Sequence, residues 1–347
     1  MSKLRKLLYP LSFLYGEIVG MRNKAFDKGV LNTTTFSTPT IVVGNLNVGG
    51  TGKSPQIEYL IRLLKNEYKT AVLSRGYKRK TKEFQIADIN STADQIGDEP
   101  LQFYKKFDDI IVAVDTDRVN GINQLTSQEP KPEVILLDDA FQHRQVHPGF
   151  VILLTSFGNL YVDDIVLPAG NLREKKEGSK RAQIIIVTKC PDKLSEEEQF
   201  KISKKLKPEL DQTVFFTKIK YHDAVVRAKE EIEIGDLKQY KVLLVTGIAN
   251  PKPLFEFLKN KKIDFTHLKF PDHHDFSSND KKKIHVAFGA LKADKKIILT
   301  TEKDYVRNFS EKDKNIYYLP IQTEFLDNGK DFNKIILNYV QETTGNS

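Results

Sequence analysis

The stretch Val43–Ser54 constrains the fold more than any other part of the chain, because its residues follow the order of a phosphate-binding P-loop. The short β-branched run Pro39–Val43 precedes it, and Pro55–Leu64, with helical apolar spacing, follows it. A strand, a glycine-rich loop and Gly-Lys-Ser opening a helix form the context that a P-loop requires. The sequence therefore predicts nucleotide binding. The competing interpretation, a glycine-rich turn without a ligand, leaves the agreement of strand, loop and helix unexplained.

The P-loop pattern predicts a role for each residue of the loop. Backbone N–H groups would surround phosphate oxygens, and the helix N-terminus would add partial positive charge. Lys53 would reach the β- and γ-phosphates, and the Ser54 hydroxyl would ligate Mg²⁺. Asn47 stands where the usual pattern has glycine, and asparagine tolerates a positive φ better than most residues. The expected nucleotide-binding residues are Asn47, Val48, Gly49, Gly50, Thr51, Gly52, Lys53 and Ser54.

A second motif follows a later apolar strand. The run Glu133–Asp139 ends in two acids, Asp138 and Asp139, which is typical of a Walker B strand that holds Mg²⁺ beside a P-loop. Many strands end in aspartate, so this motif gains its weight from the P-loop. Asp98 opens another helical pattern, where an acid is most often a cap.

Composition limits the classes of molecule that the chain is expected to bind. The 347-residue chain carries a net charge of +8, with 39% hydrophobic residues, which suggests two domains with real cores. The charge favours nucleic acid, acidic lipid or a phosphorylated substrate, although scattered lysines also fit an ordinary basic surface. The single cysteine, Cys190, excludes an internal disulfide and fits a reducing compartment. No zinc-ligand cluster and no cleavable signal is recognisable.

The N-terminal residues 3–25 are mainly apolar and aromatic, with cations at both ends. Arg5, Pro10 and Glu17 interrupt this run, whereas a membrane span needs about 20 mostly uncharged residues. An interfacial helix with lysine and arginine at anionic headgroups fits the pattern. A helix packed on the protein's own core fits it equally well.

Strands and helices alternate through residue 190, which predicts a P-loop NTPase-like α/β fold with a mainly parallel sheet and helices on both faces. We expect an N-terminal helix over 1–30, a P-loop domain over 31–212 and linker strands over 213–235. A second, smaller α/β domain is expected over 236–347, with a helix near its end.

Two histidines, His273 and His274, stand among acids in residues 270–276. A metal site, an acid/base pair and a solvated loop are all compatible with this pattern.

Several motifs run in one order across almost the whole chain and together resemble the tetraacyldisaccharide 4′-kinase family, the lipid A 4′-kinases of Gram-negative envelope synthesis. That family also lacks the first Walker glycine. The motifs are Val43–Pro55, Ser74–Tyr77, Gly97–Pro100, Leu137–Arg144, Pro168–Glu174, Phe270–His274 and Thr301–Asp304.

The resemblance implies transfer of the γ-phosphoryl group of ATP to the 4′-hydroxyl of a lipid A disaccharide 1-phosphate, with ATP and Mg²⁺ as cofactors. Asp98 would accept the hydroxyl proton, and His273 would orient and tune it. Because Asp98 and His273 fall in different expected domains, the site would lie in a cleft and need closure. The implied metal residues are Ser54, Asp138, Asp139 and Glu174, and the candidate substrate contacts are Arg75, Tyr77, Arg118, Gln142 and Arg173.

The resemblance also implies the partners and the location. It implies a glycolipid substrate and a peripheral position on the cytoplasmic face of the inner membrane, where the N-terminal stretch meets anionic lipid. Neither nucleic acid nor an obligatory protein partner is expected.

The alternative is a membrane-cycling ATPase switch of the deviant-Walker type. Such switches have a lysine just before Gly-Gly in the loop, where this chain has Val48. A nucleic-acid-dependent ATPase would suit the charge, but no nucleic-acid module is recognisable.

Overall fold

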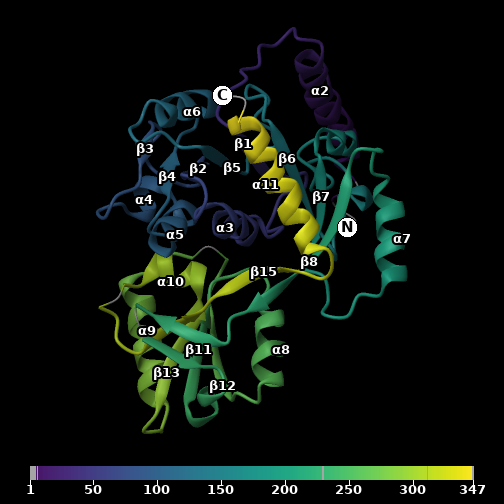
Figure 1. Cartoon of the computed structure of the whole chain (residues 1–347). Helices are drawn as coiled ribbons and strands as arrows, with labels where there is room; N and C mark the ends of the chain where they lie inside the picture. The colour runs from purple at the N-terminus through teal and green to yellow at the C-terminus, as the bar shows by residue number, and fades with distance from the viewer. Residues whose placement is uncertain (1–4, 6, 229, 273, 311, 346–347) are drawn as a thin grey trace. The chain divides into compact units, whose positions relative to one another are not determined.

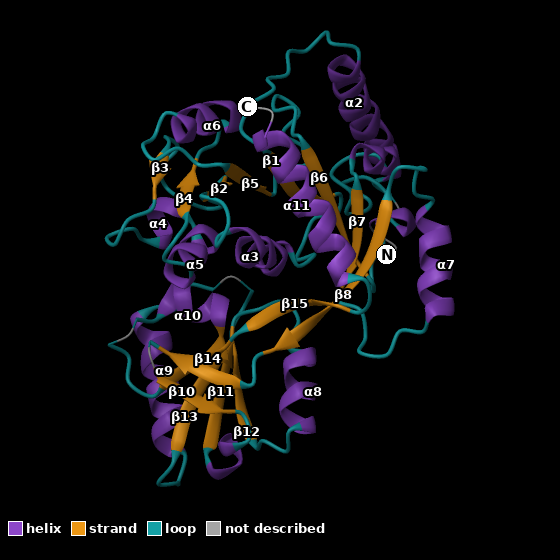
Figure 2. Cartoon of the chain, in the orientation of Figure 1, coloured by secondary structure: helices purple, strands orange, loops and turns teal. Residues whose placement is uncertain are grey.

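The chain forms two compact units in a computed structural model that describes residues 5, 7–228, 230–272, 274–310 and 312–345 (Figure 1). The first unit combines Met1–Ile219 with Thr323–Ser347, and the second is Lys220–Gln322. Both units are α/β structures (Figure 2).

A nine-stranded sheet forms the centre of the first unit, in the order β15-β8-β7-β6-β1-β5-β2-β4-β3. From β8 to β4, neighbouring strands pair in parallel, and the short β3 pairs antiparallel with β4. The central strands are continuous apolar runs because both faces of the sheet are covered. The strands are β1 (Thr40–Asn45), β2 (Thr70–Ser74), β3 (Gln85–Ile86), β4 (Ile111–Val114), β5 (Val134–Asp138), β6 (Phe150–Ser156), β7 (Ile184–Thr188), β8 (Thr213–Tyr221) and β15 (Ile321–Phe325).

Helices cover this sheet, and the last of them comes from the C-terminal end of the chain. Figure 1 shows α11 lying across the strands of the first unit beside α3. The Tyr59 hydroxyl donates to Asn333 Oδ1 at 2.8 Å, and the Tyr339 hydroxyl lies 3.2 Å from both the backbone N and O of Thr40. The helices of this unit are α2 (Tyr9–Asp27), α3 (Lys53–Leu64), α4 (Ala93–Ile96), α5 (Asp98–Lys106), α6 (Arg118–Thr126), α7 (Glu196–Leu206) and α11 (Gly329–Gly345).

The second unit contains a six-stranded sheet in the order β10-β9-β14-β13-β11-β12. Strands β12, β11, β13 and β14 pair in parallel, and β9 pairs antiparallel with both β14 and β10. Its elements are β9 (Ala224–Arg227), β10 (Glu230–Glu233), β11 (Lys241–Thr246), α8 (Lys252–Asn260), β12 (Phe265–Lys269), α9 (Ser278–Ala290), β13 (Lys296–Thr301), α10 (Glu302–Asn308) and β14 (Ile316–Leu319).

The α/β fold class is confirmed, but the expected boundaries are wrong in two places. Residues 213–235 are not a separate linker, because β8 joins the first sheet and β9 and β10 join the second. Residues 323–347 belong to the first unit rather than to a C-terminal domain that starts at 236. The apolar stripe of α11, with Phe332, Ile336 and Val340 buried, identified a helix but not the sheet that it covers.

Candidate active site

The P-loop connects β1 to α3 at the point where the strand order of the first sheet reverses. Strand β1 lies between β5 and β6, so the loops that follow β1 and β5 meet at the carboxyl edge of the sheet. Ligands of open α/β sheets bind at such switch points. The loop turns at Gly49 and Gly52, whose φ values are 109° and 87°. Asn47 is not among the residues with positive φ, so the turn forms without using the tolerance of asparagine for that conformation.

Asn47 has a packing role instead. Its side chain is buried and its Nδ2 donates to Asp164 Oδ2 at 3.4 Å, while its backbone O accepts from Asn45 Nδ2 at 2.6 Å. The amide of Val48 donates to the backbone O of Asn171 at 2.7 Å, so this N–H is already paired within the protein.

The last residue of β7 and the residue after it bind the backbone of the P-loop. Lys189 Nζ donates to the backbone O of Gly50, and the Thr188 hydroxyl donates to the backbone O of Thr51 at 2.7 Å. Burial and the charge of Lys53 lower the pKa of Lys189. The sequence predicts the end of a strand here but gives no signal for this contact.

Lys53 links the P-loop to the end of β5. Its Nζ lies 3.4 Å from Asn45 Oδ1 and 3.6 Å from Asp139 Oδ1. Arg173 Nη1 reaches the same Asp139 oxygen at 2.8 Å. Burial alone would raise the pKa of Asp139, but Lys53 and Arg173 outweigh it and hold that pKa below its usual value.

Asp138 has the opposite electrostatic environment, although it is the adjacent residue. It is 2% exposed, and burial together with the charges of Glu99 and Asp139 raises its pKa to about 7. Its Oδ2 accepts from the Ser74 hydroxyl at 3.0 Å, whereas its Oδ1 is buried without a hydrogen-bond partner among the described residues. A buried carboxylate oxygen without a partner is costly unless a cation or donor binds it.

Ser54 and Glu99 complete this acidic cluster. The Ser54 hydroxyl donates to Glu99 Oε1 at 2.8 Å, a contact that sequence reasoning missed although Glu99 stands in one of the quoted motifs. Glu99 is brought here by close backbone approach, since a Cβ on Gly97 would lie 3.0 Å from the Cα of Gly76. Asp98 is half-buried as the first residue of α5, and Gly97 rather than Asp98 is the N-cap.

Glu174 occupies a different position from the one expected. It is 1% exposed, and its two oxygens accept four hydrogen bonds, two from Arg181 and one each from Asn23 and Gln142, at 2.6–3.0 Å. Both oxygens are therefore occupied, and Glu174 acts as a structural carboxylate rather than as the metal ligand that the resemblance implied. Gln142 also donates to the backbone O of Asn45 at 3.0 Å, so it too serves the packing of this loop.

The residues that were expected to contact the substrate differ in their burial. Arg118 is 2% exposed and donates to the backbone oxygens of Asp115 and Asp138, and burial lowers its pKa to about 10. It supports the end of β5 and is not accessible to a substrate, so its predicted substrate contact is wrong. Arg75 and Tyr77 are exposed. Burial, with the charges of Arg118 and Arg75, lowers the pKa of His143 to about 4, which marks a basic environment on this side of Asp139.

The two histidines of the second unit differ in what the structure describes. His273 lies outside the described residues. His274 Nε2 lies 3.0 Å from Asp280 Oδ2, and its ring stacks on Phe270 at 5.4 Å. The His274 ring therefore already contacts Asp280, in the first turn of α9.

Comparison with known proteins identifies the family. The family model described as tetraacyldisaccharide-1-P 4′-kinase (LpxK) matches residues 4–341. Relatives named tetraacyldisaccharide 4′-kinase are 54% identical over 343 residues in Flavobacterium johnsoniae, covering 99% of both chains, and 47% identical over 363 residues in Bacteroides thetaiotaomicron, covering 99% of this chain and 96% of the relative. The chain belongs to this kinase family.

A solved structure agrees with this assignment. A crystal structure of LpxK from Aquifex aeolicus in complex with ATP matches with a TM-score of 0.78 and 30% identity, covering 97% of this chain and 99% of that one. The P-loop NTPase-like α/β fold is thereby confirmed for this kinase.

Helix α2 of the kinase has an unusual distribution of polarity. Its contacts with the first unit include polar ones: Ser12 Oγ accepts from the backbone N of Ala169, the Tyr15 hydroxyl donates to the backbone O of Arg173, and Asn23 donates to Glu174. Six of its large apolar side chains face outward and are 54–69% exposed, whereas Phe26 is buried. The six are Tyr9, Leu11, Phe13, Leu14, Ile18 and Met21. No helix in the described part of the chain is long and apolar enough to cross a membrane.

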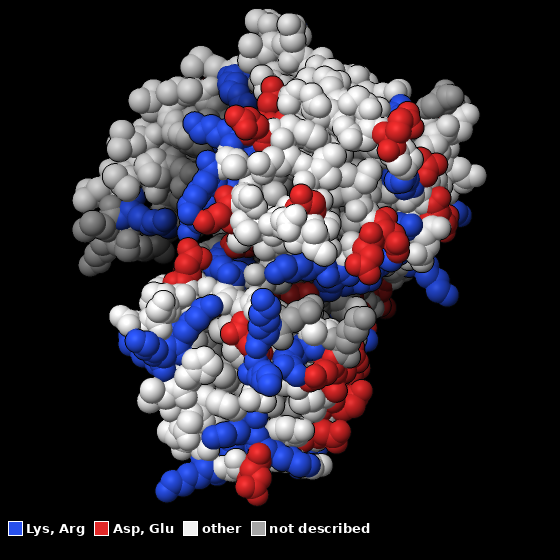
Figure 3. All heavy atoms as spheres, turned by 90° about the vertical axis from the view of Figure 1, so that its left-hand side faces the viewer, with Lys and Arg blue, Asp and Glu red and all other residues white. Residues whose placement is uncertain are grey.

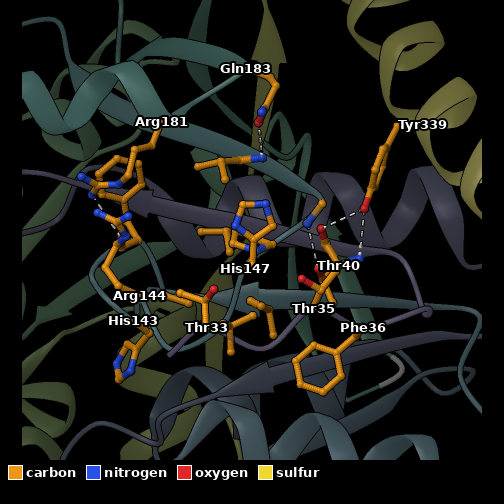
Figure 4. A pocket seen from close by; sticks show the side chains of 18 of the residues that line it. Thr33, Thr35, Phe36, Thr40, His143, Arg144, His147, Arg181, Gln183 and Tyr339 are labelled. Carbon is orange, nitrogen blue, oxygen red and sulfur yellow. Dashed lines mark hydrogen bonds between the residues drawn. The ribbon is translucent and has the colours of Figure 1, made fainter. Parts of the chain in front are cut away.

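A cavity of about 540 Å³ lies behind the loop that follows β5 (Figure 4). His143 and His147 line it together with Thr33 and Thr35 from the segment after α2. None of residues 44–54 lines it, so the cavity is separate from the P-loop. Figure 4 also shows hydrogen bonds that already join several of its walls, including the one between Thr40 and Tyr339.

Proposed function

We propose that this kinase transfers the γ-phosphoryl group of ATP to the 4′-hydroxyl of a tetraacyldisaccharide 1-phosphate. The observation that carries the proposal is the placement of Lys53 between the P-loop and Asp139 at the carboxyl edge of β1 and β5. The relatives' names supply the acceptor. In this step the acceptor oxygen bonds to the γ-phosphorus, the bond to the β,γ-bridging oxygen breaks, and ADP leaves with the electron pair.

The acidic cluster fits a magnesium ion. Among the described residues Asp138 Oδ1 is buried without a partner, Glu99 is close enough for its charge to raise the pKa of Asp138, and the Ser54 hydroxyl donates to Glu99, which makes an all-oxygen donor set. No group of three His, Cys, Asp or Glu residues within the described ranges forms a complete metal cage. This suits Mg²⁺, which usually takes one or two carboxylates together with waters and substrate phosphates. Ser54 and Asp138 would hold it, and its charge would stabilise the developing negative charge.

The other polar and charged residues have separate proposed roles. Lys53 and the loop amides position the phosphates, and Arg173 keeps Asp139 ionised beside Lys53. Asp98 accepts the proton of the acceptor hydroxyl, and His273 assists it. His274 is the weaker candidate because Asp280 already binds its ring. Arg75 and Tyr77, both exposed, are the candidate contacts to the acceptor.

Helix α2 is the proposed membrane contact, and the cytoplasmic face of the inner membrane is the proposed location of the kinase. A soluble helix turns its apolar side toward the protein, but α2 binds the first unit partly through polar groups and leaves six large apolar side chains exposed. Such a face binds the boundary between headgroups and acyl chains. It also joins the membrane contact to the site, since Tyr15 bonds Arg173.

The alternative functions draw less support. A deviant-Walker switch needs a lysine where Val48 stands. On the face in Figure 3, basic side chains lie beside acidic ones rather than in a continuous basic stripe of the kind that follows a nucleic-acid backbone.

The decisive experiment incubates the chain with γ-labelled ATP, Mg²⁺ and a tetraacyldisaccharide 1-phosphate. We expect labelled lipid in equal amount to the ADP formed, and ADP without labelled lipid would contradict the kinase assignment.

The same assay tests α2: replacing Phe13, Leu14 and Ile18 by glutamine should reduce transfer in vesicles but not in detergent micelles. Phe200→Gln, at a residue 68% exposed on α7, is the matched control.

A further inference from the structure

The loop over residues 169–175 contacts both helix α2 and the start of the P-loop. On the P-loop side, the backbone N of Arg173 donates to the backbone O of Leu46 at 2.8 Å. The adjacent Leu172 forms an antiparallel bridge with Asn47. The loop is therefore paired with the first residues of the P-loop in the manner of a short strand.

Helix α2 binds the backbone of the same loop with two hydroxyl groups. Ser12 Oγ accepts from the backbone N of Ala169 at 2.8 Å, and the Tyr15 hydroxyl donates to the backbone O of Arg173 at 2.8 Å. Ser12 is 3% exposed and Tyr15 is half-buried. The two peptide groups of Arg173 are thus held from opposite directions, the N–H by the P-loop and the carbonyl by α2.

The packing of α2 on this loop is direct. A Cβ on Gly16 would lie 3.1 Å from Val166 Cγ2 and 3.5 Å from Lys175 Cε, so the helix approaches closely where it has no side chain. Further along α2, Asn23 donates to Glu174 Oε2 at 2.6 Å. A change in the inward face of α2 should therefore be felt in the position of the loop.

The side chain of Arg173 extends from this loop to the charged cluster at the end of β5. Its Nη1 lies 2.8 Å from Asp139 Oδ1, and the same oxygen lies 3.6 Å from Lys53 Nζ. The backbone of Arg173 is held by Leu46 and Tyr15, and its guanidinium in turn holds the carboxylate beside Lys53.

We infer that Tyr15 is a positioning residue for phosphoryl transfer, because its hydroxyl fixes the backbone from which Arg173 reaches Asp139. This inference rests on the proposed roles of Lys53 and Asp139. Phenylalanine at position 15 would keep the ring and remove the donor, so the Arg173 carbonyl would lose its bond to α2. A small displacement of a group at a reaction site can lower the rate by about 10²-fold. Since Lys53 and the loop amides remain, loss of the bond should lower kcat and leave the binding of ATP nearly unchanged.

The test compares Tyr15→Phe with the matched control Tyr59→Phe. Tyr59 is also half-buried in the first unit, and its hydroxyl also donates a 2.8 Å hydrogen bond, to Asn333 on α11. Assays in detergent micelles with a tetraacyldisaccharide 1-phosphate separate the effect from membrane binding. We expect kcat of Tyr15→Phe to fall roughly 10- to 100-fold, with KM for ATP within about twofold of the original.

The control distinguishes positioning from a general loss of stability. Each variant loses one hydrogen bond, worth about 1 kcal/mol, so both should melt slightly below the unsubstituted chain and remain folded in the assay. Tyr59→Phe should keep its full kcat. Equal kcat values for the two variants, or a Tyr15→Phe variant that does not fold, would overturn the positioning role.

Combination with Arg173→Gln separates the possible failures. Arg173→Gln alone should lower kcat at least as much as Tyr15→Phe, and the double variant should be no slower than Arg173→Gln, because residues that act as a unit are not additive. Additive losses would overturn the inference and leave the proposed role of Arg173 intact. If Arg173→Gln itself keeps its full kcat, the proposed role of the Arg173–Asp139 pair fails, and the inference fails with it.

Discussion

The carboxyl edges of the two sheets differ in how their polar groups are satisfied. At the edge of β1 and β5, Asp138 Oδ1 and Thr51 Oγ1 are buried without partners among the described residues, and the charges of Glu99 and Asp139 act on Asp138. After β12, the Asn308 amide, the Asp280 carboxylate and three aromatic rings hold Phe270 and residues 274–276. The first edge has the unsatisfied charge of a ligand site, whereas the described residues after β12 are held by hydrogen bonds and aromatic packing.

This difference divides the reaction between positioning and charge. Phosphoryl transfer depends on positioned phosphates and on neutralised charge rather than on covalent chemistry by the protein. In the proposed function, the first edge supplies the charge and the second unit supplies His273. Substitutions at the first edge should therefore change charge and nucleotide binding, whereas those at the second should change geometry.

The largest effect is expected at the first edge. Lys53→Ala removes a cation that contacts both Asn45 and Asp139, and turnover should fall by roughly 10³-fold or more. Lys189→Ala is the comparison variant, because Lys189 bonds the backbone of the same loop at Gly50 from outside. Its loss should be less than about tenfold. Equal losses in steady-state assays of the two variants would contradict the assignment of Lys53.

The second prediction concerns the proton acceptor. Asp98→Ala and His273→Ala should each lower kcat by about 10²–10⁴-fold with nucleotide affinity unchanged. The double variant should be little slower than either single one if the two act as a unit. His274→Ala should instead lower the melting temperature and keep most of kcat, since it removes the Asp280 contact. An Asp98 that only stabilises α5 would cost about 1 kcal/mol of stability and leave kcat intact.

The sequence was sufficient to predict the residues at the edge of β1 and β5, because each part of a P-loop motif consists of consecutive residues. The strand, the loop, Lys53, and Asp138 after its own strand are local patterns with known partners. The fold class followed from the alternation of strands and helices. The roles of Arg118 and Glu174 were wrong because burial decides them, and burial depends on Asp115 and Arg181, whose proximity no local pattern records.

The second edge was less predictable for the same reason. Asn308 lies more than 30 residues from the loop that it binds, and asparagine has no motif there. The return of α11 to the first unit depends on packing between Phe332 and Phe215, which are far apart in the chain. Long-range contacts of this kind have no periodicity in the sequence.

The smallest effect, but the sharpest test of the comparison, is on stability. Asp138 and Asp139 are neighbours with opposite pKa shifts, so their substitution by asparagine should change stability in opposite directions. Burial raises the pKa of Asp138 to about 7, so the folded state binds more protons than the unfolded state between about pH 4 and pH 7. Stability due to Asp138 therefore falls as pH rises through that range. Lys53 and Arg173 lower the pKa of Asp139, so its contribution is present above about pH 4 and is lost as pH falls through its folded pKa.

At pH 8 without nucleotide, Asp138→Asn should therefore melt roughly 2–4 °C above the unsubstituted chain, and Asp139→Asn should melt below it by a similar amount. At pH 4 the difference for Asp138→Asn should shrink, because the folded Asp138 carboxyl is protonated there, whereas the difference for Asp139→Asn should disappear only at lower pH, as the pH falls through the folded pKa of Asp139. Addition of Mg²⁺ and ATP should reverse the order for Asp138→Asn, since ligand binding stabilises the folded state in proportion to its affinity and the variant has lost a metal oxygen. If both variants shift in the same direction at pH 8, then Asp138 is not an uncompensated charge, and the distinction between an unsatisfied edge and a satisfied one is lost.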